Sequence, residues 1–451
     1  MTISKLLKKA EQVLARCPVC DWCLGRQFAS LGYGLSNRMR GNAFKILLLL
    51  ASTETYLKSR KRGNIRLKQL AEHGMFLPAL QFLEKEGITG CAPAKHCSIC
   101  LGIMERLDEI ANLTIQKLKG WEATSILLGS KISADFVERE EQMRSELQIE
   151  TGEPLKAELN REIGKIVTDL LNIPVDFKSP DIVVVVKIPS LTVELQVNSL
   201  FIYGRYRKLI RGIPQTKWPC RECLGKGCTR CEGTGKMYPE SVEELIAAPL
   251  LEVTQGKGVK FHGAGREDID ACMLGVGRPF VLEILTPRRR NIDLEEITET
   301  INRYAQGKVE VNKLRFTNKE MVKFLKGSSA TTEKTYKAIA QTEKPLLPEE
   351  LQKLETIPMP LEIRQRTPQR VLHRRADRVR RKQIYELKVT SKDKDKIILL
   401  IRCQGGLYIK EFISGDDNRT TPSITEILGK PTKCIQLDVI DVNLPEEELQ
   451  L

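Results

Sequence analysis

The sequence has few histidines, few aromatic residues and no long apolar run. Histidine occurs 4 times among 451 residues, and Phe, Trp and Tyr together make up 5%. The longest apolar run, residues 46–51, is far shorter than the roughly 20 residues that span a bilayer. Residues 1–9 alternate charged and apolar side chains at helical spacing, so we expect no signal peptide and no membrane partner. These absences favour a cytoplasmic protein, or a nuclear one in a eukaryote.

The chain is long and basic. A length of 451 residues exceeds one ordinary hydrophobic core, so we expect two or three domains. The net charge of +14 favours a polyanionic partner such as a nucleic acid. No internal repeat or long disordered tract is visible in the sequence.

Cysteine, by contrast, is abundant. The chain has 13 cysteines, an odd number, and most of them form Cys-x-x-Cys pairs. In a chain without a secretory signal this pattern favours zinc over disulfides. The spacing is tightest in one cluster, where a glycine follows each pair and permits a tight turn. Its four thiolates would leave no open coordination position, which predicts a closed structural zinc site at Cys220, Cys223, Cys228 and Cys231.

A second set of cysteines is split between two distant segments. Near the start of the chain, Cys17, Cys20 and Cys23 form two overlapping Cys-x-x-Cys pairs. Far along the chain come a Cys97/Cys100 pair and a spare Cys91. Two distant pairs can share one tetrahedral zinc, because the thiolates need only converge in space. The spacing alone leaves open whether Cys17 or Cys91 takes part.

Two other classes of cysteine-rich protein lack part of their signature in this sequence. The cluster around Cys220 resembles the cysteine repeats of Hsp40 chaperones, which also need a His-Pro-Asp trio. No histidine of this chain precedes a proline. Pro219-Cys220-x-x-Cys223 matches half of the nucleobase-deaminase signature, which also requires an upstream His-x-Glu or its cysteine equivalent. Neither form occurs here.

Periodicity predicts a mixture of helices and strands. Helices are expected at residues 4–15, 43–58, 66–72, 76–86, 101–118, 135–149, 155–171, 293–305 and 319–325. Strands are expected at residues 123–131, 182–188, 191–203, 280–285, 309–316, 333–342, 383–389, 396–403 and 434–442. A capping box, Ser241-x-x-Glu244, opens a further helix and marks the expected start of a second domain.

Two basic segments suit RNA. Residues 198–216 combine tyrosines, arginines and glycines, a mixture suited to stacking bases and neutralising phosphates. A β-hairpin with a solvated basic face is the alternative. Residues 364–382 contain eight arginines and one lysine around a single acid, Asp377, and this density indicates phosphate contact.

The segment of residues 263–280 carries the strongest indication of chemistry. Glycine pairs at 263/265 and 275/277 flank Arg266, Glu267, Asp268 and Asp270. Glycines let the backbone approach a ligand, and the buried strand expected at 280–285 would hold an acid in place. A solvated turn whose acids cap backbone amides is the alternative reading.

The string Gly265-Arg266-Glu267-Asp268 resembles the Gly-Arg-x-Asp signature of pseudouridine synthases. Continued through Gly-Arg-Pro-Phe at 277–280, it resembles the archaeal and eukaryotic family that modifies the TΨC arm of tRNA. Segments 20–28, 370–380 and 405–413 resemble the same enzymes, although Leu407 and Lys410 replace Thr and Arg in a bacterial motif.

The resemblance implies an α+β protein with two domains. Residues 1–240 would form an α/β, THUMP-like RNA-binding domain with zinc knuckles. Residues 241–451 would form the catalytic domain, built on a mainly antiparallel sheet with flanking helices. Because segment 20–28 resembles the N-terminal motif of this family, Cys20 and Cys23 are preferred to Cys17. The expected zinc ligands are therefore Cys20, Cys23, Cys97 and Cys100.

The resemblance also implies a reaction and its residues. Asp268 would be the nucleophile that isomerises uridine 54, uridine 55 or both in tRNA, without an organic cofactor. Tyr336, Tyr408 and Arg266 would bind the target nucleotide, and Lys410 would pair with Asp268. We expect a monomer whose partner is tRNA. A non-catalytic zinc-containing RNA-binding protein and a zinc-bearing chaperone or scaffold are the alternatives.

Overall fold

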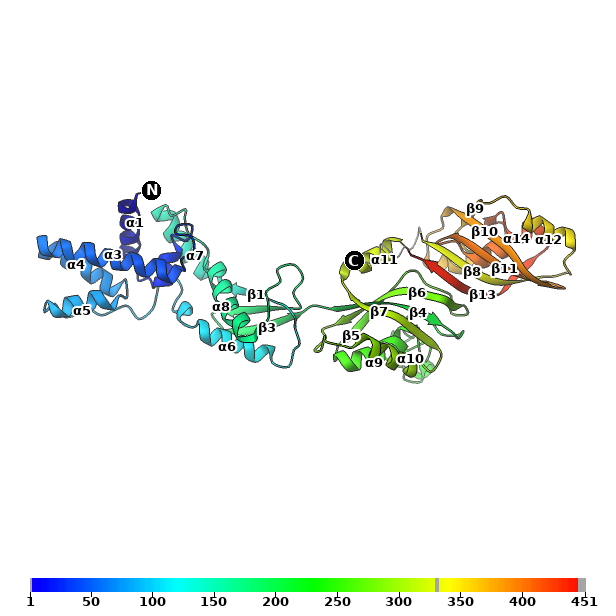
Figure 1. The fold of residues 1–451 in the computed structure, drawn as a ribbon, viewed down its shortest axis with the longest axis horizontal. Coiled ribbons are helices and arrows are strands. Elements are labelled where there is room, and N and C mark those ends of the chain that lie inside the picture. The colour runs from blue at the N-terminus through cyan, green and yellow to red at the C-terminus, as the bar shows by residue number, and fades with distance from the viewer. Residues whose placement is uncertain (1, 329–331, 445–451) are drawn as a thin grey trace. The chain divides into compact units, whose positions relative to one another are not determined.

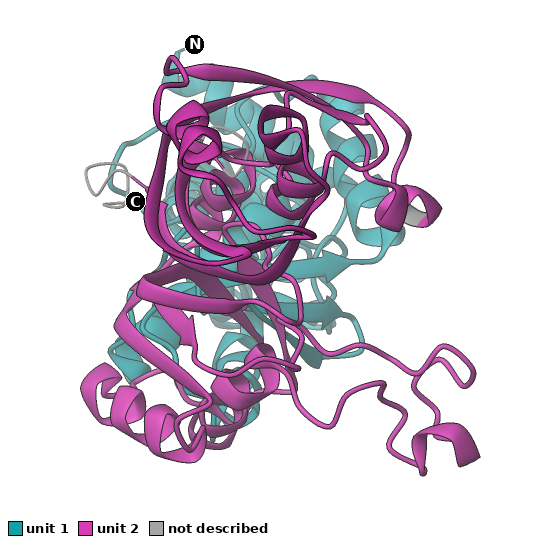
Figure 2. Ribbon diagram, turned by 90° about the vertical axis from the view of Figure 1, so that its right-hand side faces the viewer, with its two compact units in different colours: residues 1–198 teal, residues 199–451 magenta. Residues whose placement is uncertain are grey.

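The computed structural model describes residues 2–328 and 332–444, which form two compact units (Figure 2). Unit 1 ends at Asn198 and unit 2 begins at Ser199. This division lies earlier than the domain boundary expected at 240/241. The reason is strand β4 (Leu200–Lys208), which pairs with β6 (Cys272–Leu285) and β7 (Val309–Thr317) and so belongs to the sheet of unit 2.

Unit 1 is mostly helical (blue to teal in Figure 1). Its helices are α1 (Ile3–Arg16), α2 (Asp21–Arg26), α3 (Asn37–Lys58), α4 (Arg60–Glu72), α5 (Leu77–Lys85), α6 (Leu107–Leu118), α7 (Ala134–Leu147) and α8 (Leu155–Leu171). Its strands are β1 (Ile126–Ile132), β2 (Ile182–Ile188) and β3 (Thr192–Val197). β2 lies between β1, which is parallel to it, and β3, which is antiparallel.

The small sheet of unit 1 is covered by helices, and its central strand is apolar except for Lys187. Along β2, Ile182, Val184 and Val186 are fully buried. α8 packs against β1, and α6 packs against β2 and β3. The predicted helix at 155–171 and the predicted strand at 182–188 match the observed bounds.

Unit 2 is built on one large sheet (green to red in Figure 1). Its remaining strands are β5 (Gly258–Gly263), β8 (Glu333–Thr342), β9 (Leu361–Arg366), β10 (Val379–Asp393), β11 (Lys396–Gln404), β12 (Thr420–Thr421) and β13 (Thr432–Asn443). Its helices are α9 (Val242–Thr254), α10 (Leu294–Tyr304), α11 (Lys319–Ser328), α12 (Pro348–Glu355), α13 (Ile409–Ser414) and α14 (Ile424–Leu428).

Among the described residues, the sheet order is β12-β9-β10-β11-β8-β13-β6-β4-β7, with β5 beside β6. Neighbouring strands are antiparallel except for β13 and β6, which run parallel through Asp438–Val439 and Cys272–Met273. The prediction of a mainly antiparallel sheet with flanking helices is therefore confirmed.

The sheet carries two hydrophobic cores. One lies between β4–β7 and helices α9, α10 and α11, and the other lies between β8–β11 and helices α12, α13 and α14. Tyr336 of β8 packs against both cores. The parallel pair β13–β6 therefore joins two halves of unit 2, and side chains from both halves meet at this seam.

The basic, aromatic segment that begins at Asn198 is not the RNA-stacking surface that its composition indicates. β4 is an interior strand of the sheet, and Tyr203, Tyr206 and Lys208 are buried within it. Arg205 is buried too and donates to the carbonyl of Gly277. The aromatic and basic side chains of β4 therefore pack and form hydrogen bonds inside unit 2. Across residues 2–328 and 332–444, none of the helices has the length and apolar character needed to cross a membrane.

Candidate active site

The acidic segment identified in the sequence forms a loop between β5 and β6. Lys208 holds the backbone of this loop. Its buried ammonium donates hydrogen bonds to the carbonyls of Ile213, Asp268 and Ile269 at 3.0–3.1 Å. Gly265 adopts the left-handed conformation with φ of 82°. β6 itself begins at Cys272 and already contains the glycines 275 and 277, so this pair lies within a strand instead of closing the loop.

Glu267 is a structural residue. Its carboxylate is buried, forms an ion pair with Arg278 at 2.8 Å, and accepts a hydrogen bond from the Tyr206 hydroxyl at 2.8 Å. Gln215 in turn donates to the Tyr206 oxygen and to the carbonyl of Gly265. The carboxylate of Glu267 is therefore committed to holding the loop, and it is no longer a candidate nucleophile.

Asp268 faces a cavity instead. Its side chain is one-third exposed, at 33%, and Arg370 approaches both carboxylate oxygens at 3.2 and 3.3 Å. The Lys410 ammonium lies 3.5 Å from Oδ2 of the same carboxylate. Two neighbouring cations therefore hold this carboxylate in place, and a carboxylate can act as a nucleophile.

The pairing of Lys410 differs from expectation. Its ammonium lies 2.7 and 2.8 Å from the two oxygens of Asp270, closer than to Asp268. Burial alone would raise the pKa of Asp270, but the Lys410 ammonium outweighs it and lowers that pKa. Lys410 therefore bridges Asp268 and Asp270, and its closer partner is Asp270.

Arg370 is a site residue that the sequence did not single out. Besides Asp268, its guanidinium binds the buried carboxylate of Glu411 through Nε at 2.6 Å. Burial works against a charged arginine, but the Glu411 and Asp268 carboxylates dominate and raise the pKa of Arg370. Arg370 lies in the basic segment 364–382, whose eight arginines cannot be distinguished from one another by sequence alone. Only the fold shows which of them reaches the acid.

The two predicted tyrosines both line the cavity that contains Asp268. Tyr336 reaches it from β8, and burial raises the pKa of its hydroxyl, so that it stays protonated at neutral pH. Tyr408 stands at the N-terminus of α13, where the buried amide of Gln365 binds both its N–H and its C=O. The Arg370 guanidinium lies 5.8 Å from the Tyr408 ring centroid.

The cavity has a volume of about 380 Å³. Its wall combines the acidic loop, two tyrosines and Leu407 with several cations. Those cations are Arg266, Arg278, Lys334, Arg370, Arg375, Arg380, Lys382 and Lys410. Aromatic rings suit a flat base, and the cations suit an anionic backbone.

Arg266 connects the loop to the second cysteine cluster. Its guanidinium lies 5.0 Å from the ring centroid of Trp218, a cation–π contact. Trp218 comes two residues before Cys220, and its ring packs edge-on against Tyr238 beyond the cluster. The segment that carries the cysteines therefore supports the Arg266 side chain through Trp218.

That second cluster has the geometry of a metal site. The sulfur atoms of Cys220, Cys223, Cys228 and Cys231 lie within 4.8 Å of one another, with three separations of 3.7, 3.8 and 3.9 Å. A zinc–sulfur bond of about 2.3 Å implies tetrahedral S···S edges of about 3.8 Å, whereas a disulfide bond is about 2.05 Å. The four thiols therefore fit one tetrahedral metal ion.

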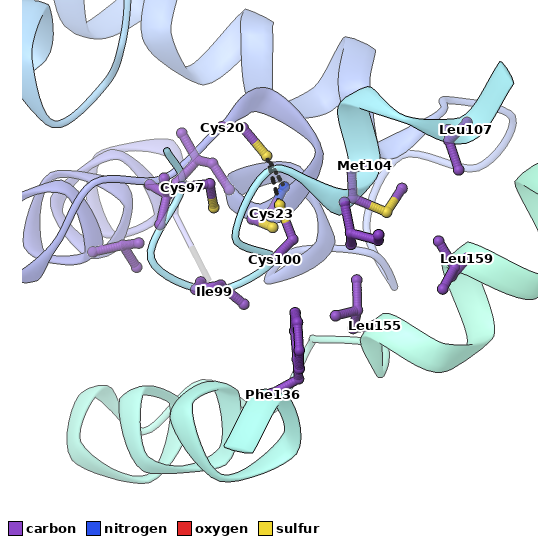
Figure 3. Close-up of a cluster of buried hydrophobic side chains, with 14 of the residues drawn as sticks. Cys20, Cys23, Cys97, Ile99, Cys100, Met104, Leu107, Phe136, Leu155 and Leu159 are labelled. Carbon is purple, nitrogen blue, oxygen red and sulfur yellow. Dashed lines mark hydrogen bonds between the residues drawn. The ribbon is translucent and has the colours of Figure 1, made fainter. Parts of the chain in front are cut away.

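The split set in unit 1 converges as well. Cys20, Cys23, Cys97 and Cys100 bring their sulfur atoms within 4.8 Å of one another, and all four are buried in the core of unit 1 (Figure 3). Cys20 and Cys100 are 3.8 Å apart. Arg26 donates to the Cys23 sulfur and is itself neutralised by Glu140 and Glu158. Cys17 and Cys91 lie outside the cluster.

We expect purified protein to hold up to two zinc ions per chain. Cys228→Ser should lose one equivalent in elemental analysis, because a hydroxyl replaces a thiolate ligand. Cys434→Ser is the matched control, since Cys434 is a partly exposed cysteine outside both clusters. Equal zinc content in the two variants, or no zinc in the wild type, would contradict the assignment.

Comparison with known proteins places the chain beside one family. Residues 201–443 match the family described as "Pus10, C-terminal", and residues 110–187 match "Pus10 THUMP domain, archaeal". A "tRNA pseudouridine synthase Pus10" of Methanothrix thermoacetophila is 42% identical over 441 residues, covering 97% of this chain and 95% of the relative. One of Methanothermobacter marburgensis is 44% identical over 430 residues, covering 95% and 96%. A solved Cbf5-Nop10-Gar1 complex matches 45% of each chain at 15% identity, and its TM-score of 0.27 is too low to carry an argument.

Proposed function

The chain belongs to the Pus10 family, and on that premise we propose that it is a tRNA pseudouridine synthase with Asp268 as its nucleophile. The family and enzyme class predicted from the Gly-Arg-x-Asp string are thereby confirmed. The observation that carries the role of Asp268 is its position. It is a carboxylate held between Arg370 and Lys410, on the wall of a cavity that also contains Tyr336 and Tyr408.

The chemistry needs only what this cavity contains. Turning uridine into pseudouridine detaches the base and rejoins it through carbon, without oxidation or reduction. The Asp268 carboxylate supplies a nucleophile, and Arg370 and Lys410 beside it hold it in position. The tyrosines offer flat surfaces for a base that has left its stack. Each cysteine cluster would hold a zinc ion that stabilises its local fold, because four thiolates leave no open coordination position.

The substrate of this chain is proposed to be the TΨC arm of tRNA, at position 54, position 55 or both. Exposed cations of the segment 364–382 would contact phosphates, and among them Arg375 lines the cavity that contains Asp268. The THUMP portion of unit 1 would bind another part of the same tRNA. A cytoplasmic monomer remains our expectation.

Turnover on unmodified tRNA tests the proposal. The transcript carries tritium at C5 of its uridines, and isomerisation releases that tritium because C5 gains the bond to ribose. We expect release from a wild-type transcript and none from one whose uridines 54 and 55 are replaced by cytidine. Tight binding without release would instead favour the non-catalytic RNA-binding protein, and neither binding nor release would favour a scaffold.

A further inference from the structure

Among the described residues, three lysines are more than nine-tenths buried, and one of them differs from the others in having no bonding partner. Lys45 is 1% exposed and forms an ion pair with Asp21 at 2.6 Å. Lys208 is 0% exposed and donates to three backbone carbonyls. Lys334 is 7% exposed, yet within residues 2–328 and 332–444 no hydrogen bond or ion pair reaches its ammonium.

The surroundings of Lys334 make this lack of a partner costly. It lies on β8, two residues before Tyr336 and on the same face of the strand, and its side chain lines the cavity that contains Asp268. Its Nζ occupies the space over Gly265, where an added Cβ would lie 2.8 Å away. The guanidinium of Arg278 borders the same space, and the carboxylate of Glu267, which also faces Lys334, is already paired with Arg278. The Cys403 thiol and the Lys382 ammonium also act on the charge of Lys334.

Desolvation and the neighbouring Arg278 cation together lower the pKa of Lys334 to about 7. A buried amine without a partner costs free energy unless something supplies one. The protein supplies a partner for Lys45 and for Lys208. For Lys334, a molecule that enters the cavity can supply the acceptor.

We propose that the Lys334 ammonium donates a hydrogen bond to a carbonyl oxygen of the target uracil and stabilises negative charge on the ring during isomerisation. The depth of the residue favours the base over the phosphates. Arg375 and other exposed cations are available to phosphates at the rim, whereas Lys334 lies inside, beside Tyr336. This inference rests on the proposed synthase function.

The charge in question follows from the reaction. The N1–C1′ bond breaks as the Asp268 carboxylate bonds to C1′, and the electron pair stays with the ring, so the detached uracil is anionic over N1, O2 and O4. C5 then bonds to C1′ and displaces the carboxylate, the C5 proton leaves, and N1 gains a proton, so Asp268 is regenerated and the composition of the nucleotide is unchanged. A fixed cation that meets the ring oxygen where this charge develops accelerates bond breaking more than it strengthens ground-state binding.

Lys334→Met tests the role with an apolar side chain of similar length. We expect kcat/KM for pseudouridine formation to fall about 10²-fold, the usual effect of removing one such donor, while tRNA binding changes little. Thermal unfolding should show a folded protein, because the variant removes an unpaired buried amine. Lys337→Met, on the exposed side of the same strand, is the matched control and should keep wild-type turnover.

The pH profile of the wild type gives an independent readout that needs no variant. Because the protonated form is the active one, kcat/KM should fall as pH rises through about 7, and this inflection should be absent from Lys334→Met. Turnover of Lys334→Met within threefold of the wild type would overturn the inference, and so would a wild-type profile that rises through pH 7. A wild type without any turnover would instead contradict the synthase function itself.

Discussion

Asp268→Asn is expected to fold, keep its zinc and bind tRNA, yet form no detectable pseudouridine. The amide has nearly the shape of the carboxylate, and the loop does not depend on the side chain of Asp268. Lys208 holds the loop through backbone carbonyls, and Glu267 holds it through Arg278. An amide nitrogen and oxygen cannot act as the nucleophile. The measurement is tritium release under single-turnover conditions, with tRNA affinity measured in parallel.

Asp270→Asn separates the two exposed acids of the loop. The side chain of Asp270 is 69% exposed, whereas that of Asp268 is 33% exposed. Among the described residues, the cation that forms an ion pair with Asp270 is Lys410. We expect Asp270→Asn to retain measurable turnover, reduced because Lys410 loses its nearer anchor. Normal turnover by Asp268→Asn would remove the proposed mechanism. Abolition of activity only at Asp270 would move the nucleophile by two residues.

The second large effect is expected at Arg370. Arg370→Met removes the cation that contacts both oxygens of Asp268 and leaves the buried carboxylate of Glu411 without its partner. Breaking a fully buried pair costs about 3–5 kcal/mol, and solvent screening at Arg370, whose side chain is 38% exposed, reduces this to about 2–3 kcal/mol. If this cost falls on the transition state, the rate drops by about 30- to 150-fold. Part of the cost will appear as lower thermal stability.

A double variant separates the two consequences of losing Arg370. Glu411→Gln removes the uncompensated charge, so Arg370→Met combined with Glu411→Gln should recover thermal stability but not turnover. Arg303→Met, which changes an exposed arginine of α10 outside that segment, should match the wild type in stability and change turnover little. Recovery of turnover in the double variant would show that Arg370 acts only on folding.

Local patterns predicted local structure well. The apolar periodicity of residues 155–171 and the β-branched run of residues 182–188 give the observed helix and strand, because each satisfies its own hydrogen bonds and buries one apolar surface. The compact spacing of Cys220 to Cys231 likewise needs only a short ribbon to bring four sulfur atoms together.

Long-range partners were beyond such patterns. The sequence of β4 is basic and aromatic, and only its position between β6 and β7 shows that Tyr206 and Lys208 point inward as supports of the acidic loop. Arg370 and Asp268 are 102 residues apart, so no spacing rule could choose Arg370 among its neighbours. Lys334 lies two residues from a predicted tyrosine, but its lack of a carboxylate partner is visible only in three dimensions.

The contact between Arg266 and Trp218 links two equilibria that would otherwise be independent. A metal ion held by Cys220 and its partners would fix the ribbon that carries Trp218, and Trp218 contacts a cation at the wall of the cavity. Coupling between two binding sites is reciprocal by thermodynamic necessity. Whatever factor the metal adds to the affinity for RNA, bound RNA must add to the affinity for the metal. A chelator should therefore strip this cluster more slowly from the RNA complex than from the free protein.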